Sequence, residues 1–304
     1  MSMRYAAGFI SAFYNPLKNP NAPTIGTATA TFGGITVAFT APSNVGGSAI
    51  TSYIATAKRT SDGVLFTASG ASSPITITGL TEVAFTATVI AVNSYGPSAS
   101  SATSNSVTPM MALGSALGGG FFAGQISTAG NGVADYNLVV GPVSSAQNAS
   151  VQWKIVNTTT SGTTSVIDGP ANSTAMNDVT HPAAQFCEGL TIGGFSDWYM
   201  PAKNELEVCY YNLKPTTGNN NTSSGTNTNA VPSRGSNYTS GTPTQTSATD
   251  FKVGGTESFG SNDFWSSTEA NATRASSTAF GAGYQYNNTK TSAIRVRAIR
   301  RVAV

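Results

Sequence analysis

Charged side chains are scarce in this sequence, and this scarcity constrains the fold more than any other feature. Asp, Glu, Lys and Arg make up 9% of the 304 residues, whereas about a quarter is usual in globular proteins. Ser, Thr, Asn and 32 Gly take their place, and such residues favour turns over helices. Coiled coils and helical bundles are therefore excluded, while 14 Phe, 11 Tyr and 3 Trp argue against general disorder. A mainly β, turn-rich protein of two domains remains.

The charge balance and the cysteines narrow the range of partners. A net charge of +2 is too small to attract nucleic acid through counterion release, so we expect no nucleic-acid partner. Cys187 and Cys209 are too few for a disulfide framework or a zinc site, and a disulfide between them is the less favoured alternative to two buried thiols. The uncharged stretch 110–126 is short and interrupted by glycines, and residues 1–13 lack the pattern of a cleaved signal peptide. We expect no membrane insertion, no metal and no other cofactor.

Three zones follow one another along the chain. Residues 1–20 form a short apolar peptide that cannot fold alone, and it either packs on the next domain or attaches the chain to another protein. Residues 21–109 alternate apolar and polar side chains in short runs, most clearly at 34–40, 50–57 and 85–92. About seven strands at this spacing predict a β-sandwich.

The second zone resembles a fibronectin type III domain along its whole length. The resemblance is carried by Pro23 and Thr24, by residues 50–53, by residues 75–81 and by residues 89–98. Phe85 stands where the family has the tyrosine of its tyrosine corner, and Val37 or Phe39 stands in place of the family's tryptophan. The resemblance implies a spacer domain rather than a binding site.

The third zone, 110–304, contains all three Trp, both Cys and the only His, so its core is expected to be richer. Apolar periodicity predicts helices over 178–188 and 201–213, the second with Pro201 at its first position. The expected strands cover 136–140, 151–156 and 293–302. Residues 216–249 are a run of Asn, Thr, Ser and Gly, and a loop of this length in a compact domain is usually functional or disordered.

Four runs of the third zone resemble the C-terminal domain of the Legionella collagen-like adhesin, a domain found in bacterial surface proteins and phage proteins. The runs are 181–187, 193–201 with Glu205 and Leu206, 264–269, and 296–300. The resemblance implies a C-type-lectin-like fold, and adhesion or display rather than catalysis. With the two short helices predicted from periodicity, the expected fold of this zone is α+β. Tyr199 departs from the family pattern, in which Arg is commoner, so a salt bridge made there in relatives is expected to be absent.

The conspicuous motif residues have a structural interpretation. Asp197 and Trp198 follow a glycine turn, Pro201 introduces the second helix, and Trp265 is expected to anchor the core. Arg295 and Arg297 alternate with apolar residues on the C-terminal strand. We favour pairing of their guanidinium groups with carboxylates across a subunit interface, and binding of anionic glycans is the alternative.

No arrangement of residues predicts an enzyme. His181 is the only imidazole, and its position before a proline at a helix start favours a structural role over that of a catalytic base. A glycosidase pair among Glu205, Asp263 and Glu269 has no support from the spacing.

Amide, guanidinium and aromatic side chains suited to hydroxyl-rich ligands gather in the polar run and in a second patch near the C-terminus. The candidate receptor or glycan surface consists of Asn219, Asn220, Asn221, Asn227, Asn229, Arg234, Asn237 and Tyr238, together with Tyr284 and Tyr286. These residues can also be explained as solvated loops or as contacts to neighbouring subunits, and we favour this explanation over a binding surface.

These observations favour a phage virion protein: an N-terminal attachment peptide at 1–20, a fibronectin-like spacer at 21–109 and an adhesin-like domain at 110–304. Its expected partners are other virion proteins, further copies of itself in a homotrimer, and a host-surface glycan. It is expected in the virion, assembled in the host cytoplasm, as a fibre or a capsid decoration. A bacterial cell-surface adhesin is the alternative, and a glycan-cleaving enzyme is the least favoured.

Overall fold

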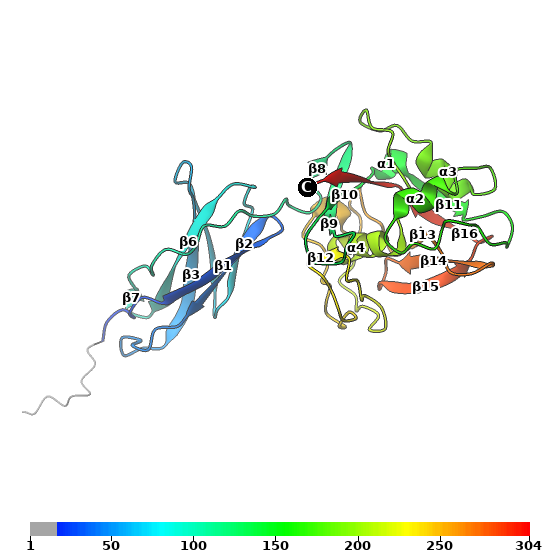
Figure 1. The fold of residues 1–304 in the computed structure, drawn as a ribbon. Helices are drawn as coiled ribbons and strands as arrows, with labels where there is room; N and C mark the ends of the chain where they lie inside the picture. Colours follow the sequence, from blue (N-terminus) through cyan, green and yellow to red (C-terminus); the bar gives the residue numbers. More distant parts are fainter. Residues whose placement is uncertain (1–16) are drawn as a thin grey trace, which may run out of the picture. The chain divides into compact units, whose positions relative to one another are not determined.

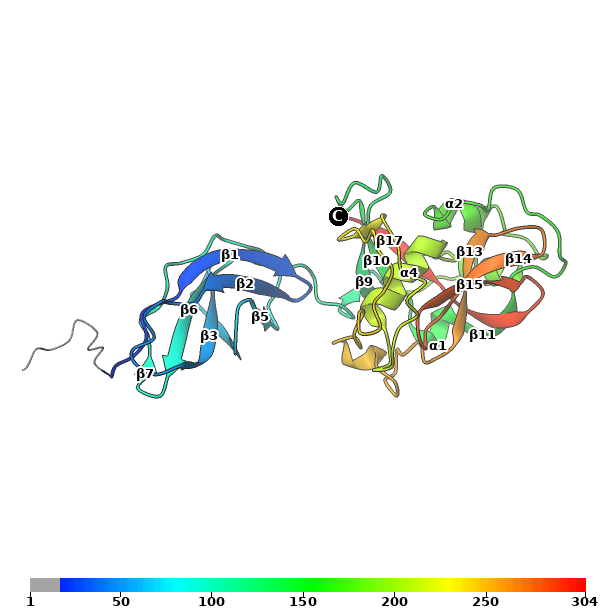
Figure 2. The same cartoon turned by 90° about the horizontal axis from the view of Figure 1, so that it is seen from below.

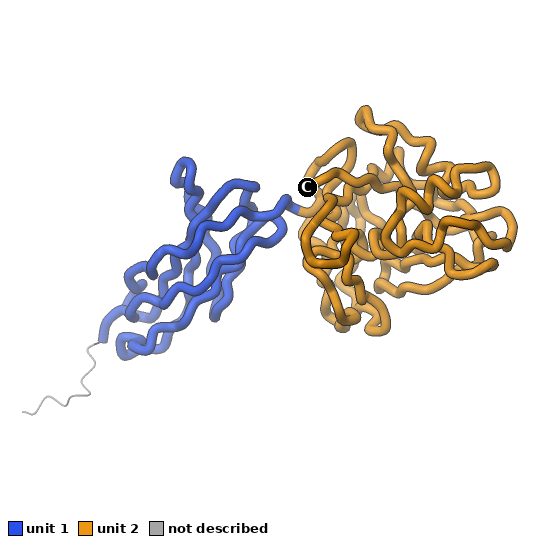
Figure 3. The backbone as a smooth tube through the Cα atoms, viewed as in Figure 1, with its two compact units in different colours: residues 1–112 blue, residues 113–304 orange. Residues whose placement is uncertain are grey.

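The computed structural model describes residues 17–304, so most of the predicted N-terminal peptide lies outside the described residues. The chain divides into two compact units, Met1–Ala112 and Leu113–Val304 (Figure 3). The sequence predicts the boundary three residues earlier, between 109 and 110. Among the described residues, no helix has the length and apolar character needed to cross a membrane.

The described part of unit 1 is a β-sandwich of seven strands (Figure 1). One sheet has the order β1 (Thr24–Thr31), β2 (Gly34–Thr40), β5 (Ile75–Thr78), and the other has the order β4 (Leu65–Gly70), β3 (Ile50–Arg59), β6 (Phe85–Asn93), β7 (Gly96–Pro97). Neighbouring strands are antiparallel, and alternate residues such as Ile35, Val37, Ala55 and Val89 fill the space between the sheets. Phe85, at the predicted position of the tyrosine corner, is fully buried. Three strands facing four make this unit fibronectin type III-like, as predicted.

Lys18 and Asn19, at the start of the described residues, hydrogen bond to the rest of unit 1. The Lys18 amide donates to the Gly46 carbonyl at 2.9 Å, and the Asn93 side chain donates to the Lys18 carbonyl at 2.9 Å. The Asn19 side chain donates to the Pro97 carbonyl at 2.8 Å. A Cβ atom at Gly46 would lie 1.9 Å from the Lys18 carbonyl oxygen, so this close approach requires glycine.

Unit 2 is an α+β domain with two five-stranded sheets (Figures 1 and 2). The first sheet has the order β12 (Ala230–Val231), β9 (Gly120–Ile126), β10 (Tyr136–Val140), β17 (Ile299–Ala303), with β8 (Ala116–Leu117) beside β9. The second sheet has the order β11 (Gln147–Gln152), β16 (Ala293–Arg297), β13 (Asp263–Glu269), β14 (Arg274–Ala279), β15 (Tyr284–Thr289). The helices are α1 (Val143–Ala146), α2 (Gly169–Thr174), α3 (Pro182–Glu188) and α4 (Lys203–Leu213), and a 3₁₀ turn covers Thr249–Phe251.

The predicted helices are α3 and α4, but each begins later than predicted. In front of α3, the Asp178 side chain accepts bonds from the backbone and hydroxyl of Thr180, which forms a turn instead of a helical start. Pro201 precedes the N-cap residue Ala202 and is not the first helical residue. The sequence did not predict α1 and α2, because helices of four and six residues are too short to show periodicity.

Two predicted strands differ from the structure. The predicted strand 151–156 is wrong in its bounds, because the strand found there, β11, covers Gln147–Gln152. There Trp153 enters the core, and Lys154 turns its ammonium group to the carbonyls of Thr158 and Thr159. The predicted strand 293–302 is two strands, since the chain passes from one sheet to the other at Ala298.

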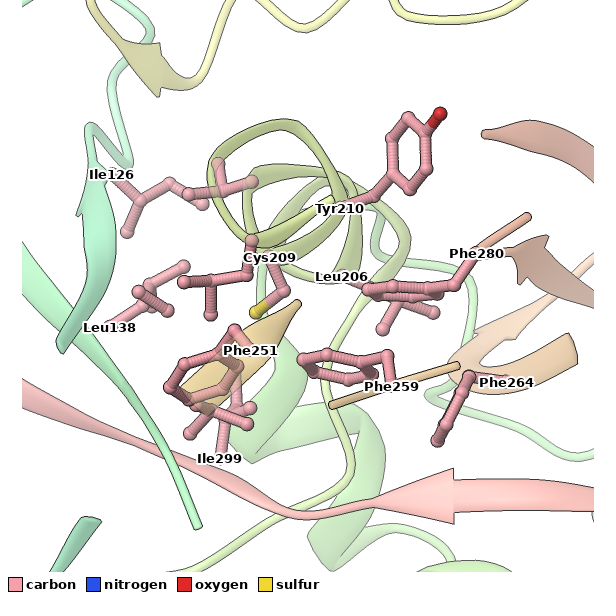
Figure 4. Close-up of a cluster of buried hydrophobic side chains, with 14 of the residues drawn as sticks. Ile126, Leu138, Leu206, Cys209, Tyr210, Phe251, Phe259, Phe264, Phe280 and Ile299 are labelled. Carbon is pink, nitrogen blue, oxygen red and sulfur yellow. The ribbon is translucent and has the colours of Figure 1, made fainter. Parts of the chain in front are cut away.

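Helix α4 is central to unit 2, because it packs against strands of both sheets. Its apolar face places Leu206, Cys209 and Leu213 in a core with the rings of Phe251, Phe259, Phe264 and Phe280 (Figure 4). Phe259 and Phe280 stack with ring centroids 4.0 Å apart. A second core gathers around Trp153, Trp198 and Trp265. Next to this apolar face lies a polar face with Asn204, Glu207 and the hydroxyl of Tyr210, whose ring still packs against Phe280. The polar face is left to hold other parts of the chain.

Candidate recognition surface

The polar face of α4 holds the polar loop, which we define as residues 214–248. Asn204, Glu207 and Tyr210 follow one another at three-residue steps and so share one side of the helix, and each hydrogen bonds to a residue of the loop. Lys214 continues this row directly after the helix and donates to the Gly218 and Pro243 carbonyls. The loop is thus built around the helix.

Glu207 is the centre of the first attachment. Its carboxylate is fully buried and accepts from the Tyr238 hydroxyl at 2.7 Å and from the Asn227 side chain at 2.5 Å. It also forms an ion pair with Arg234, whose guanidinium lies 3.9 Å from the centre of the Tyr211 ring. Burial raises the pKa of Glu207, and the charge of Arg234 and the hydrogen bonds oppose that rise. One carboxylate therefore fixes three points of the loop.

Asn220 is the centre of the second attachment. Its side-chain oxygen accepts from the Tyr210 hydroxyl at 2.6 Å, and its side-chain nitrogen donates to the Pro243 carbonyl at 2.8 Å. Lys214 donates to the same carbonyl at 3.1 Å. These bonds join the beginning of the loop to its end, so the loop has a closed base.

The structure corrects part of the predicted recognition surface. Asn220, Asn227 and Tyr238 are buried, with 6%, 1% and 5% of their surface exposed, and they hold the loop from inside. Asn219 and Asn237 are exposed as expected. Asn221, Asn229 and Arg234 are partly exposed, and each also bonds within unit 2. Burial separates these residues into anchors and outward-facing groups.

Three open hollows lie around the polar loop. The first, of about 250 Å³, is lined by Tyr211, Arg234, Asn237 and Thr239, among others. The second, of about 300 Å³, lies between Tyr211 and residues 242–247, and the third, of about 310 Å³, lies between Asn219 and Gln245. Hydroxyl, amide and aromatic groups of this kind suit ligands that are rich in hydroxyl groups.

The second predicted patch adjoins the polar loop. Tyr284 and Tyr286 lie on the edge strand β15 with ring centroids 5.2 Å apart, and Tyr284 is 45% exposed. The backbone amide of Gln285 donates to the Ser224 hydroxyl of the loop at 3.0 Å. The backbone amide of Gly225 in turn donates to the Gln285 side chain at 3.3 Å, so two hydrogen bonds at Gln285 join β15 to the polar loop.

The motif residues are structural. Asp197 accepts two bonds from the guanidinium of Arg300, at 2.7 and 2.9 Å, and this pairing lowers the pKa of Asp197. Trp198 and Trp265 are buried, and their indole groups donate to the carbonyls of Phe195 and Val151. Pro201 is also buried.

Arg297 takes neither of the expected roles. It is 1% exposed, pairs with Glu257 at 2.7 Å and donates to the Gly141 carbonyl at 2.8 Å. Its guanidinium also lies against the rings of Phe251 and Phe259. The segment 251–259 covers the strand face that the sequence placed in solvent or at a subunit interface, so Arg297 pairs within its own chain.

The residues with catalytic potential are held by partners inside unit 2: His181 and Glu269 share one network, because both hydrogen bond to Thr160, whereas Glu205 has other partners. His181 lies between Asp178 and Thr160, at 2.9 and 2.8 Å, and burial lowers its pKa. Glu205 pairs with Arg301 and accepts from the Tyr199 hydroxyl at 2.6 Å.

Glu269 pairs with Lys290 inside the same domain. Cys187 and Cys209 are buried free thiols. Within residues 17–304, no three His, Cys, Asp or Glu residues are grouped as metal ligands.

Comparison with known proteins gives matches at the level of solved structures. No protein-family model matches the chain, and no curated protein matches it. A module of titin from human cardiac muscle is 28% identical, with 31% of this chain and 89% of that module covered and a TM-score of 0.24. The FN5 domain of Drosophila Lar is 21% identical, with 30% and 97% covered and a TM-score of 0.25.

Larger solved structures also match. The twitchin kinase region from C. elegans is 21% identical, with 30% of this chain covered and a TM-score of 0.28. The chain spans only 17% of that structure, and 17% of the structure of titin kinase and its flanking domains. By the order of its strands, unit 1 of this chain is a fibronectin type III-like domain.

Proposed function

We propose that this chain is a virion structural protein of the fibre or decoration type, in which unit 2 recognises a host surface. The polar loop is the observation that carries the proposal. Its anchors are buried against α4, while its hydroxyl and amide groups line three open hollows. A loop that is already ordered loses little conformational entropy when it binds, which favours recognition.

The packing of the adhesin-like runs supports the same proposal. All four runs contribute to the second core of unit 2, through Cys187, Trp198, Trp265 and Val296. The segments on which the resemblance rests therefore pack together in one core. In this proposal unit 1 is a spacer, and the N-terminal peptide attaches the chain to other virion proteins.

Labelling of intact particles tests the proposal. An antibody against unit 2 is applied to particles from cells that carry the gene and to particles from a deletion strain. We expect gold label on the first sample alone, at the particle surface. Absence of the chain from the particles would overturn the proposal. Label on whole cells in its place would favour a cell-surface adhesin.

A further inference from the structure

A further hollow lies in the second sheet of unit 2, and no residue of the polar loop is among its lining residues. It has a volume of about 410 Å³ and is lined by Ala149, Ser261, Asn262, Asp263 and the first three residues of β16. Strands β13 and β16 run side by side here, with Phe264 opposite Arg295. Asp263 and Arg295 therefore reach this hollow from neighbouring strands.

Arg295 differs from the other arginines that the structure describes. Each of those has a hydrogen bond or an ion pair: Arg59 with Asp62, Arg234 with Glu207, Arg274 with Asn287, Arg297 with Glu257, Arg300 with Asp197 and Arg301 with Glu205. The guanidinium of Arg295 has neither among residues 17–304. Its five N–H donors are thus open to a ligand.

Asp263 lines the same hollow but does not pair with Arg295. One of its carboxylate oxygens accepts from the Tyr286 hydroxyl, and the other has no donor among the described residues. Burial, together with the hydrogen bond to Asp263, raises the pKa of Tyr286 to about 12, so the phenol remains a donor at neutral pH. The hollow therefore offers a fixed negative group and an open positive group.

We propose that this hollow binds a small zwitterionic group, whose acidic end pairs with Arg295 and whose ammonium end pairs with Asp263. A ligand with negative charge alone pairs with Arg295 but is repelled by Asp263, and a ligand with positive charge alone pairs with Asp263 but is repelled by Arg295. A zwitterion satisfies both, and the hydroxyl of Ser261 and the amide of Asn262 provide further hydrogen bonds.

The shared chemistry is an ammonium group a few bonds away from a carboxylate or a phosphate. Phosphoethanolamine substituents of a surface polymer have both groups, and so does an amino acid that is free or attached through its side chain. The location of such groups on a host surface rests on the proposed function, whereas binding in the hollow does not.

Calorimetric titration of the full chain tests this inference. The probes are D-alanine and O-phosphoethanolamine, and the single-charge controls are acetate, inorganic phosphate and ethanolamine. We expect at least one zwitterion to bind with a Kd at least about tenfold below that of each control. Which probe binds decides between a carboxylate and a phosphate as the acidic end.

Variants connect the binding to the hollow. Arg295→Gln and Asp263→Asn are each expected to raise the Kd of the zwitterion by about tenfold or more, because each removes one charge pair. Arg274→Gln, on an exposed arginine outside the hollow, is the matched control and should leave the Kd unchanged. Since Arg295 has no partner to lose, Arg295→Gln should also keep the melting temperature of the parent.

Several outcomes would overturn the inference. One is the absence of binding by both zwitterions. Another is inorganic phosphate binding as tightly as the zwitterions, with a Kd that Asp263→Asn does not change, which would show a simple anion site. Undiminished binding by Arg295→Gln would place the ligand elsewhere. If the particles are labelled but neither zwitterion binds, the inference alone is overturned. If a zwitterion binds but the particles are unlabelled, only the proposed function is overturned.

Discussion

The carboxylate of Glu207 accepts a hydrogen bond from the hydroxyl of Tyr238 at 2.7 Å, and this bond joins the central helix of unit 2 to the far part of the polar loop. The two residues are separated by 31 positions in the sequence. Both are buried, so the loop rests on a polar interior that the fold must satisfy.

Loss of the Tyr238 hydroxyl should destabilise unit 2. Tyr238→Phe removes a donor from a buried carboxylate and is expected to cost about 1–3 kcal/mol of unfolding free energy. Glu207→Ala leaves Arg234 without its partner and should cost about 3–5 kcal/mol. Denaturant unfolding followed by tryptophan fluorescence measures this, because all three tryptophans lie in unit 2. Tyr284→Phe, on an exposed tyrosine, should change stability by less than about 0.5 kcal/mol, and an equal effect of both Tyr variants would contradict the account.

Arg297 and Arg295 provide a matched pair on one strand. Arg297→Lys loses the planar fork that serves Gly141 and Glu257 together, and we expect it to cost about 2–4 kcal/mol. Arg295→Lys should cost less than about 0.5 kcal/mol, because the guanidinium of Arg295 has no partner among the described residues. The same unfolding measurement compares them, and similar losses from both substitutions would show that Arg297 is not held as described.

Acid should destabilise unit 2 partly through Asp178. Hydrogen bonds from Thr180 above all, and from His181, lower the pKa of Asp178 from 3.8 to about 2. Since the folded pKa lies below the unfolded one, the contribution of Asp178 to stability is present above pH 3.8 and is lost as the pH falls through about 2. Asp178→Asn should therefore make the unfolding midpoint less dependent on pH between these values. An unchanged pH profile in the variant would contradict this assignment.

Both thiols should be unreactive in the folded protein. Cys187 and Cys209 are fully buried, and burial raises the pKa of Cys209 to about 12. A disulfide-exchange reagent at mildly alkaline pH should label neither thiol in buffer and both in denaturant. Rapid labelling in buffer would show that the core around α3 or α4 opens readily.

The sequence predicts those helices and strands whose apolar residues repeat at a regular spacing within the element itself. Helix α4 follows from the spacing of Leu206, Cys209 and Leu213, and the sandwich strands follow from alternation with period two. The roles of Arg295 and Arg297 do not follow, because alternation places both on one strand face but does not show that residues 251–259 cover part of it.

In the polar loop, too, the role of a residue depends on partners that are distant in the sequence. Asn219 and Asn220 are adjacent and identical in type, yet one is exposed and the other is an anchor. Only the distant partners of Asn220, which include Tyr210 and Pro243, distinguish them. The one signal in the sequence is the polar row Asn204, Glu207 and Tyr210 on α4, which requires partners from elsewhere in the chain.

Competition for adsorption tests most directly whether the polar loop is a recognition surface. Purified chain is added to host cells before the particles, and unadsorbed particles are counted. We predict that the chain lowers adsorption and that a variant with Asn219→Ala and Asn237→Ala, which changes exposed loop residues, does not. A control with Asn157→Ala and Asn177→Ala, exposed residues outside the loop, should compete like the parent. If the chain leaves adsorption unchanged, or if the loop variant competes as well as the parent, the polar loop is not the surface that recognises the host.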